Sequence, residues 1–319
     1  MKNIWIAKAL TQKALSLLPG AHHWNKWFQK HVTRGYWLST ALFERKREHA
    51  LKHINAYQRW QKTTPRNERI IPRVALEIGT GWYPVVPLSL IAAGVERVYS
   101  VDIVWLCTKK QLERTLDLFL TQVALDEPIR ERFFEARLAL SKQSLVKTLA
   151  DLGVHYLIGD ARHLSLPEGS VDLVHSNNTF EHIPAIVLED ILKEFERVLC
   201  PGGVQTHFID LTDHFAHFDR SITPYHFLQF SDRAWSRIDN SIQPMNRLRQ
   251  SDYLRMYDRV GLERVEHTWE PGDLTALSKV RLSARFASYA SVDAAITHCS
   301  LSSVKGSIPT QDTKKRTKP

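Results

Sequence analysis

Cysteine is scarce in this sequence: its 319 residues include only Cys107, Cys200 and Cys299. Three cysteines, with no Cys-x-x-Cys pair and no accompanying histidine spacing, exclude a disulfide framework and a cysteine-based zinc site. We therefore expect a reducing compartment. Hydrophobic residues make up 43% of the chain, which excludes a disordered or fibrous protein and allows one substantial core with appended segments.

Long hydrophobic runs are also absent. No stretch approaches the roughly 20 apolar residues that a membrane-spanning helix needs. Lys8 and Lys13 interrupt the first apolar stretch, which therefore lacks the unbroken centre of a signal peptide. The sequence predicts a cytoplasmic protein.

The N-terminal stretch has the period of an amphipathic helix. Its apolar residues recur at helical spacing with lysines between them; they are Ile4, Ala7, Leu10, Ala14, Leu15 and Leu18. Docking on the protein's own core is the favoured interpretation. Peripheral contact with a membrane surface stays open as the alternative.

Acidic residues are few at both ends of the chain. Residues 1–70 carry a net charge of +11 and residues 305–319 a net charge of +4, which leaves −6 between them. Basic ends could meet acidic glycans, anionic lipids or nucleic acid, or could simply face solvent. We expect a basic helical extension over 1–70, a catalytic domain over 71–305, and a disordered basic tail over 306–319.

Short β-rich runs alternate with helical runs after a predicted helix at 38–60 and a linker at 63–67. Strands are expected at 74–78, 97–102, 155–159, 171–176 and 203–210, and helices at 84–93, 108–125, 129–151 and 186–199. This alternation predicts an α/β fold with a doubly wound, mostly parallel sheet. Residues 211–247 show neither the helical nor the strand repeat of apolar residues, which predicts an inserted substrate-side loop or lid. A helix at 251–261 and strands at 262–269 and 280–286 complete the prediction.

A glycine turn follows the first predicted strand. The segment Val74-Ala-Leu-Glu77-Ile-Gly79-Thr80-Gly81 ends a buried strand and leads into a helix near Pro84. Such a turn lets backbone N–H groups approach a ligand closely at the carboxyl end of the strand. Asp102 ends the second strand, where a carboxylate can bind both hydroxyls of a ribose.

Three further features narrow the choice of cofactor. Glu77 places an acid where a pyrophosphate would normally be, which suits a cationic or amino-acid-bearing cofactor better. Asp160 and Ala161 follow the third strand, where a carboxylate could bind an adenine amino group. Pro201-Gly202-Gly203 forms a tight turn into the fifth strand.

The glycine turn with Glu77, the acid that ends the second strand, the Gly-Asp-Ala after the third and the Pro-Gly-Gly turn occur in this order. As a set these four features resemble those of class I methyltransferases, specifically the small-molecule group, over about residues 72–210. The resemblance implies a seven-stranded, Rossmann-like sheet and S-adenosylmethionine as methyl donor. It implies that the methionine part contacts Glu77, Gly79, Thr80 and Gly81, the ribose Asp102, the adenine Asp160 and Ala161, and the reactive end Asn177. Tyr83 stands where the family often has a third glycine, so the loop is expected to cap the cofactor differently.

The flanks are similar to those of uncharacterised bacterial methyltransferases associated with surface polysaccharides. The features that carry this weaker resemblance are the basic N-terminus and the His- and Phe-rich run 206–219. It implies a glycan-like acceptor.

Candidate catalytic groups follow strands four and five. Methyl transfer to a hydroxyl requires alignment and removal of a proton. The candidates are Glu181, His182, Asp210 and His214, with His214 or Asp210 preferred as the base. Glu181 and His182 could instead serve only the start of the following helix.

A metal site is not expected. His207, Asp210, His214 and His217 are suitable ligand types. However, His207 and Asp210 fall on a predicted strand, where alternation directs them to opposite faces.

Three competing functions remain. An NAD-dependent oxidoreductase needs a third glycine where Pro84 stands. A nucleic-acid methyltransferase is disfavoured because Asn177-Asn-Thr-Phe180 lacks both prolines of the amino-methylating signature. A non-catalytic scaffold is disfavoured by the intact cofactor features. The sequence thus predicts S-adenosylmethionine-dependent methyl transfer to a hydroxyl of a small-molecule or glycan-like acceptor.

Overall fold

The computed structural model describes residues 4–17, 37–63, 70–262 and 265–306. Its centre is a seven-stranded sheet in the order β3-β2-β1-β4-β5-β7-β6. The strands are β1 (Val74–Ile78), β2 (Arg97–Asp102), β3 (Val154–Ile158), β4 (Val171–Asn177), β5 (Leu199–Asp210), β6 (Val265–Glu270) and β7 (His298–Val304). The first five run parallel, and β7 pairs antiparallel with both β5 and β6. The predicted doubly wound, mostly parallel seven-stranded sheet is confirmed.

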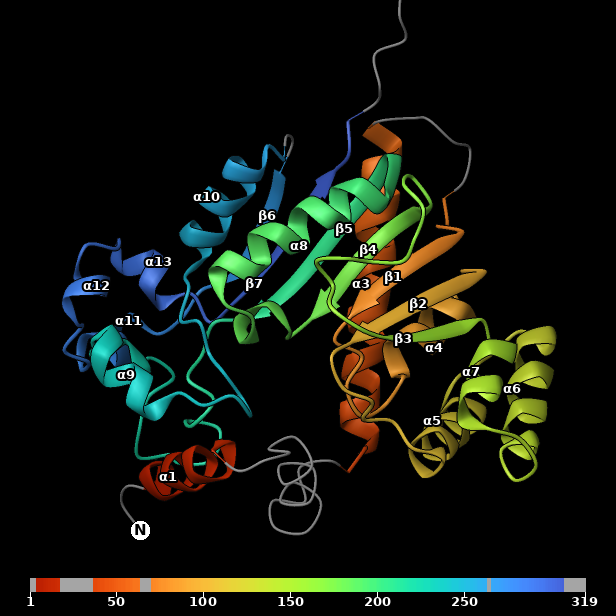
Figure 1. The fold of residues 1–319 in the computed structure, drawn as a ribbon, viewed down its shortest axis with the longest axis horizontal. Helices are drawn as coiled ribbons and strands as arrows, with labels where there is room; N and C mark the ends of the chain where they lie inside the picture. Colours follow the sequence, from red (N-terminus) through yellow and green to blue (C-terminus); the bar gives the residue numbers. More distant parts are fainter. Residues whose placement is uncertain (1–3, 18–36, 64–69, 263–264, 307–319) are drawn as a thin grey trace, which may run out of the picture.

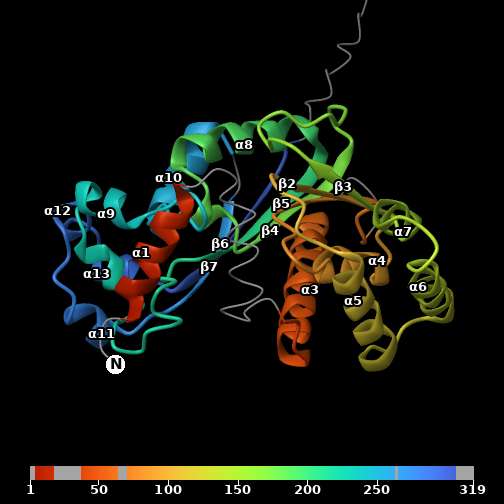
Figure 2. The same cartoon turned by 60° about the horizontal axis from the view of Figure 1, so that its bottom comes forward.

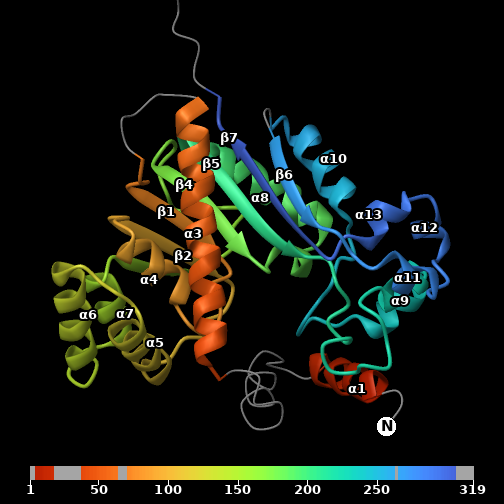
Figure 3. The same cartoon turned by 180° about the vertical axis from the view of Figure 1, so that it is seen from behind.

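Helices cover both faces of the sheet (Figures 1 and 3). The long helix α3 (Thr40–Thr63) crosses one face beside α4 (Val85–Ala92) and α5 (Lys109–Gln122). On the other face lie α8 (Ala185–Val198) and α10 (Gln250–Val260). Helices α6 (Glu127–Ala139) and α7 (Leu145–Asp151) lie between α5 and β3 in the chain. Each face therefore has its own hydrophobic core, and the carboxyl ends of the parallel strands meet at one edge.

Local sequence explains the strand and helix boundaries near that edge. The apolar run Val74–Ile78 is buried from its second residue onward, as a central parallel strand requires. Helix α5 begins where the Thr108 hydroxyl accepts a hydrogen bond from the Gln111 N–H. Helix α10 ends at Gly261, whose φ of 81° lies in the left-handed region.

Three sequence predictions differ from the structure. The helix expected at 129–151 is two helices, α6 and α7, because Ser144 caps a new start by accepting from the Lys147 N–H. The strand expected at 280–286 is wrong, since Ala284–Ala287 is a short helix, α12. The last strand is β7, which the sequence did not predict. Its three serines, Ser300, Ser302 and Ser303, did not indicate a buried strand.

The inserted segment 211–247 is partly helical. It contains the 3-10 helix η3 (His226–Gln229) and α9 (Asp232–Ile238), and it packs with α11 (Leu274–Ser278), α12 and α13 (Ser291–Ala295) around a third hydrophobic core. Helix α1 (Ile4–Ser16) lies beside α9 at this end of the molecule, away from α5 to α7 (Figure 2).

Helix α1 docks on the inserted segment, but not through the face that its apolar period predicts. Ala9 and Gln12 are its buried residues, whereas Leu10 is 66% exposed and Ile4 is 41% exposed. No helix in the described ranges is long and apolar enough to cross a membrane. Contact of α1 with a membrane surface stays a prediction, and the predicted disordered tail, 306–319, lies outside the described residues except for its first position.

Candidate active site

The glycine loop after β1 needs glycine for two separate reasons. Gly79 and Gly81 have φ values of 81° and 70°, which side chains rarely adopt. A Cβ at Gly79 would also overlap the Thr179 hydroxyl and lie 2.7 Å from Thr179 Cγ2. At Gly81 the same Cβ would point into open space. The loop therefore packs tightly against the end of β4 while leaving Gly81 facing a cavity.

The main cavity, of about 720 Å³, lies at the carboxyl ends of the parallel strands. Gly79, Asp102, Asp160 and Ala161 line it. Its apolar walls include Ile103, Ile158, Ile183, Val187 and Ile191. Residues 241–244 of the inserted segment close one side, and we call them the lid segment. The insertion thus lines the cavity, as the sequence predicts for a lid.

Asp102 sits where the sequence places a ribose-binding carboxylate. Its two oxygens accept hydrogen bonds of 3.3 Å from the N–H groups of Gly81 and Val104. Asp160 also lines the cavity, but its carboxylate is in a bidentate pair with Arg162, with N···O distances of 2.6 to 3.0 Å. This pairing lowers the pKa of Asp160 to about 2. Asp160 therefore stays ionised, and part of its hydrogen-bonding capacity is already used.

Glu77 lies behind the loop rather than on the cavity wall. It is 3% exposed, and its carboxylate accepts from the hydroxyls of Thr80 (2.6 Å) and Ser100 (3.4 Å). Burial raises the pKa of Glu77 to about 7, although these hydroxyls and the nearby Lys46 ammonium oppose that rise. Glu77 is thus a buried acid that changes charge near neutral pH.

Helix α3 contributes residues that the sequence did not indicate. A smaller cavity of about 250 Å³ lies between α3 and the glycine loop, lined by Lys46, His49, Thr80, Gly81 and Asn177 among others. The side-chain oxygen of Asn177 accepts hydrogen bonds of 3.1 Å from both His49 and His53. These contacts join residues more than 120 positions apart, which no local pattern reveals. They fix the orientation of the side chain that the sequence places at the cofactor's reactive end.

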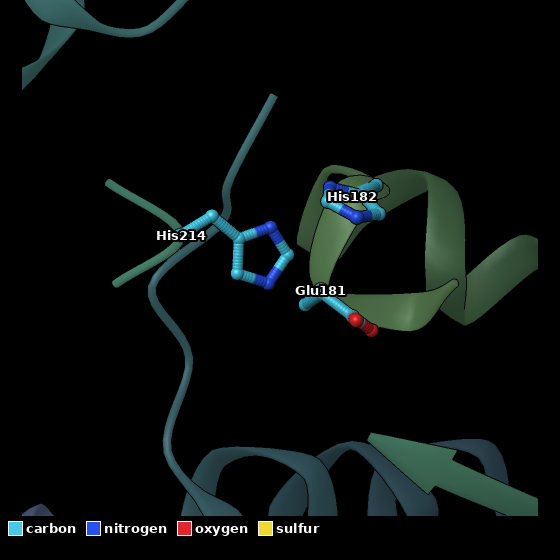
Figure 4. Close-up of side chains that lie close together, drawn as sticks. All are labelled: Glu181, His182 and His214. Atoms are coloured by element: carbon cyan, nitrogen blue, oxygen red, sulfur yellow. The ribbon is translucent and has the colours of Figure 1, made fainter. Parts of the chain in front are cut away.

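The four predicted catalytic residues come together beneath the lid segment. We call Glu181, His182, Asp210 and His214 the acid–histidine cluster; Figure 4 shows three of its members. Glu181 and His182 lie on the 3-10 helix η2 (Phe180–His182), and Asp210 ends β5. His214 Nε2 lies 3.3 Å from the Asp210 carboxylate. Of the four, only His182 lines the main cavity.

Burial shifts the pKa values of this cluster. It raises the pKa of Glu181 well above its usual range and lowers the pKa of His182 to about 4. For Asp210 burial acts in the raising direction, but the nearby His214 imidazole and the hydrogen bonds from Thr212 outweigh it and hold the pKa well below its usual range. Two carboxyl groups therefore lie close together with opposite protonation tendencies, an arrangement typical of acid–base sites.

The structure separates His207 from the other three residues considered for a metal. His207 stacks on Phe180 and Phe195 and bonds Ser176, on the α8 face of the sheet. Asp210, His214 and His217 lie together beyond the end of β5, with Asp210 4.0 Å from His217. The alternation argument for His207 is confirmed.

The comparisons with known proteins give one family match. A family model described as a methyltransferase domain matches residues 133–206. A search of the curated proteins gives no match.

Solved structures with similar folds include a phosphoethanolamine N-methyltransferase 2 of Haemonchus contortus in complex with S-adenosyl-L-methionine. It is 12% identical, with a TM-score of 0.43, over 88% of this chain and 60% of that one. Another is a SAM-dependent methyltransferase of Methanosarcina mazei, 13% identical, with a TM-score of 0.40, over 74% of this chain and 93% of that one. Both TM-scores are below 0.5, so the assignment depends on the strand order, the glycine loop and the matched domain.

Proposed function

We propose that this chain, a class I, S-adenosylmethionine-dependent methyltransferase, methylates a hydroxyl of a small-molecule or glycan-like acceptor. Methyl transfer itself follows from the matched domain and the fold. The choice of a hydroxyl is our inference from the acid–histidine cluster beneath the lid segment. A hydroxyl must lose its proton to become a good nucleophile, and a buried cluster of acids and imidazoles supplies acceptors for that proton.

The residues of the main cavity fit the proposed cofactor. Gly79, in the main cavity, and Gly81, in the smaller one, bring the backbone close to the position of an amino-acid moiety, and the Asp102 carboxylate can accept from ribose hydroxyls. The apolar wall that includes Ile103 and Ile158 suits the faces of an adenine ring. The buried acid Glu77 favours a cationic ligand nearby, and the Lys46 ammonium offsets only part of the pKa rise that burial causes.

The chain's own residues do the positioning. S-adenosylmethionine, when bound, supplies an electrophilic methyl group on a sulfonium. Asn177, held by His49 and His53, limits movement at the predicted reactive end. The lid segment excludes water on the side where His182 lines the cavity, which strengthens electrostatic interactions inside it. The cluster then receives the proton of the acceptor hydroxyl.

Calorimetric titration with S-adenosylmethionine, S-adenosylhomocysteine and NAD tests the cofactor. We expect binding of the first two but not of NAD, and a loss of affinity in Asp102→Ala. His214→Asn should bind S-adenosylmethionine as the wild type does, yet turn over a screened hydroxyl acceptor at least ~100-fold more slowly, the usual contribution of a proton-transfer group. Arg220→Ala is an inert control on the inserted segment. Full turnover by His214→Asn would contradict the role of the cluster.

A further inference from the structure

Glu181 is an unusual buried acid. Its side chain is 3% exposed, and neither carboxylate oxygen has a hydrogen-bond partner among the described residues. A carboxyl group without a partner in such a position is costly in either protonation state. Native structures normally satisfy such groups with an ordered water or an ion.

Two histidines lie near Glu181 (Figure 4). One ligand atom from each of Glu181, His182 and His214 can be chosen so that all three lie within 4.8 Å of one another. The two imidazole rings meet edge to face with centroids 5.0 Å apart. Nε2 of His214 is buried and makes no hydrogen bond of regular geometry among the described residues, although the Asp210 carboxylate lies 3.3 Å away.

The surroundings orient both rings. His182 Nδ1 lies 2.7 Å from the carbonyl oxygen of Pro244, so Nδ1 carries the proton and Nε2 keeps its lone pair. His214 Nδ1 accepts from the side-chain amide of Gln243 (3.2 Å), so metal binding through Nε2 requires the Gln243 amide to turn and present its oxygen to a protonated Nδ1. Outer contacts of this type fix imidazole orientation in metal sites.

We propose that Glu181, His182 and His214 bind a divalent transition-metal ion of the zinc, cobalt, manganese or iron(II) class. Two imidazoles and one carboxylate form a donor set suited to these ions, whereas magnesium and calcium prefer all-oxygen ligands. Metal–ligand bonds of about 2.1 Å would require the three donor atoms to contract to roughly 3 to 3.5 Å apart. The ion supplies the positive partner that the Glu181 carboxylate lacks.

Asp210 and the main cavity give this site a catalytic consequence, which rests on the proposed function. His182 is shared between the site and the cavity wall. An acceptor hydroxyl at an open coordination position of the ion would have a lowered pKa; as the methyl group left the sulfonium for the hydroxyl oxygen, the proton would pass to the Asp210 carboxylate, the one member of the cluster that is not a ligand. The Asp210 carboxylate, 3.3 Å from His214 Nε2, stabilises the charged site. In this arrangement the cluster activates the hydroxyl through the ion, and His214 is a ligand.

Cobalt(II) is the probe for a direct test of binding. Full-length protein without a histidine tag is stripped with a chelator, dialysed and titrated with Co²⁺, and its visible absorption bands are followed. We expect saturation at one ion per chain and displacement by Zn²⁺. Glu181→Gln, His182→Ala and His214→Ala should each weaken binding by at least ~10-fold. His217→Ala is the matched control, because this neighbouring histidine is not one of the three ligands and should leave the titration unchanged.

A second titration with S-adenosylmethionine separates the two proposals. Retained cofactor binding in the three ligand variants shows that they are folded. If the wild type binds S-adenosylmethionine but saturates with no Co²⁺, or if His182→Ala and His214→Ala bind Co²⁺ like the wild type, the metal site is overturned. If Co²⁺ binds as expected while S-adenosylmethionine does not, the proposed function fails and the metal site stands.

Discussion

Gly79 is constrained both by its backbone conformation and by the space around it, whereas Gly81 is constrained only by its backbone conformation. Both have left-handed φ values, which cost a side-chain-bearing residue about 1–2 kcal/mol. Only at Gly79 would a Cβ also collide with Thr179. We therefore expect Gly81→Ala to lower the free energy of unfolding by about that amount and Gly79→Ala to lower it clearly more.

Urea unfolding without cofactor measures both variants. The double variant Gly79→Ala/Thr179→Ala should recover part of the loss, because it removes both Thr179 atoms nearest to the added methyl group. Equal losses in Gly79→Ala and Gly81→Ala would show that the overlap relaxes without cost.

Glu77 should make cofactor binding depend on pH. Its pKa of about 7 means that it is partly protonated at neutral pH when no cofactor is bound. A cationic cofactor favours the ionised form, so binding should release protons, and affinity for S-adenosylmethionine should rise from pH 6 to pH 8. Calorimetry in buffers of different ionisation enthalpy measures the release. Glu77→Gln should abolish this component, and an unchanged proton release in that variant would exclude Glu77 as its source.

Helix α1 contacts the lid segment, which lines the main cavity. The Lys13 ammonium donates to the carbonyl oxygens of Ser236 (3.0 Å) and Asp239 (2.7 Å), and Gln12 donates to Gln243 of the lid segment (3.3 Å). Lys13→Ala removes two hydrogen bonds worth about 1 kcal/mol each. We expect faster amide exchange over residues 239–246 and weaker binding of S-adenosylmethionine.

The control for this experiment is on the same helix. Leu10 is 66% exposed, so Leu10→Ala should change neither amide exchange nor cofactor affinity. If Leu10→Ala loosened the lid as much as Lys13→Ala does, a general disturbance of α1 rather than the loss of the Lys13 contacts would explain the effect.

Sequence alone predicted the bounds of the strands that neighbouring residues in the chain mark. Val74–Ile78 and Arg97–Asp102 have the predicted bounds, because each is a β-rich run followed directly by a turn or a site residue. Strand β7 could not be predicted in the same way, since its serines are buried only by pairing with β5 and β6.

The same distinction applies to the residues of the candidate site. Its glycine loop and Asp102 follow strand ends and can be found by spacing. The support of Asn177 by His49 and His53, and the meeting of Glu181 with His214, depend on chain segments brought together only in the folded protein.

The whole molecule contains histidines that are neutral because they are buried. Burial lowers the pKa of His53 to about 4 and holds those of His175 and His207 well below their usual value. In the unfolded chain these groups titrate near pH 6.5. As pH falls from 6.5 toward 4, the unfolded state therefore takes up protons that the folded state does not, and stability is lost.

Glu77 acts in the opposite direction over part of that range. Its pKa is raised, so between about pH 7 and 4.5 the folded state holds a proton that the unfolded state releases, and this contribution to stability grows as pH falls. With His182 and Glu181 included, four such histidines against two such acids leave the unfolded state with about two more bound protons. Stability should thus fall by up to about 3 kcal/mol per pH unit in this window.

Urea unfolding midpoints measured between pH 7 and pH 4.5 test this loss of stability. Two variants should change its slope with pH in opposite directions. His53→Gln removes one titrating histidine and should make the decline shallower, by about 3 kcal/mol over the whole window for a pKa displaced from 6.5 to about 4. Glu77→Gln removes the opposing acid and should make the decline steeper. Because the two variants change the slope with opposite signs, general destabilisation cannot mimic the pair. A slope left unchanged by both would place the acid sensitivity outside the buried core beneath α3.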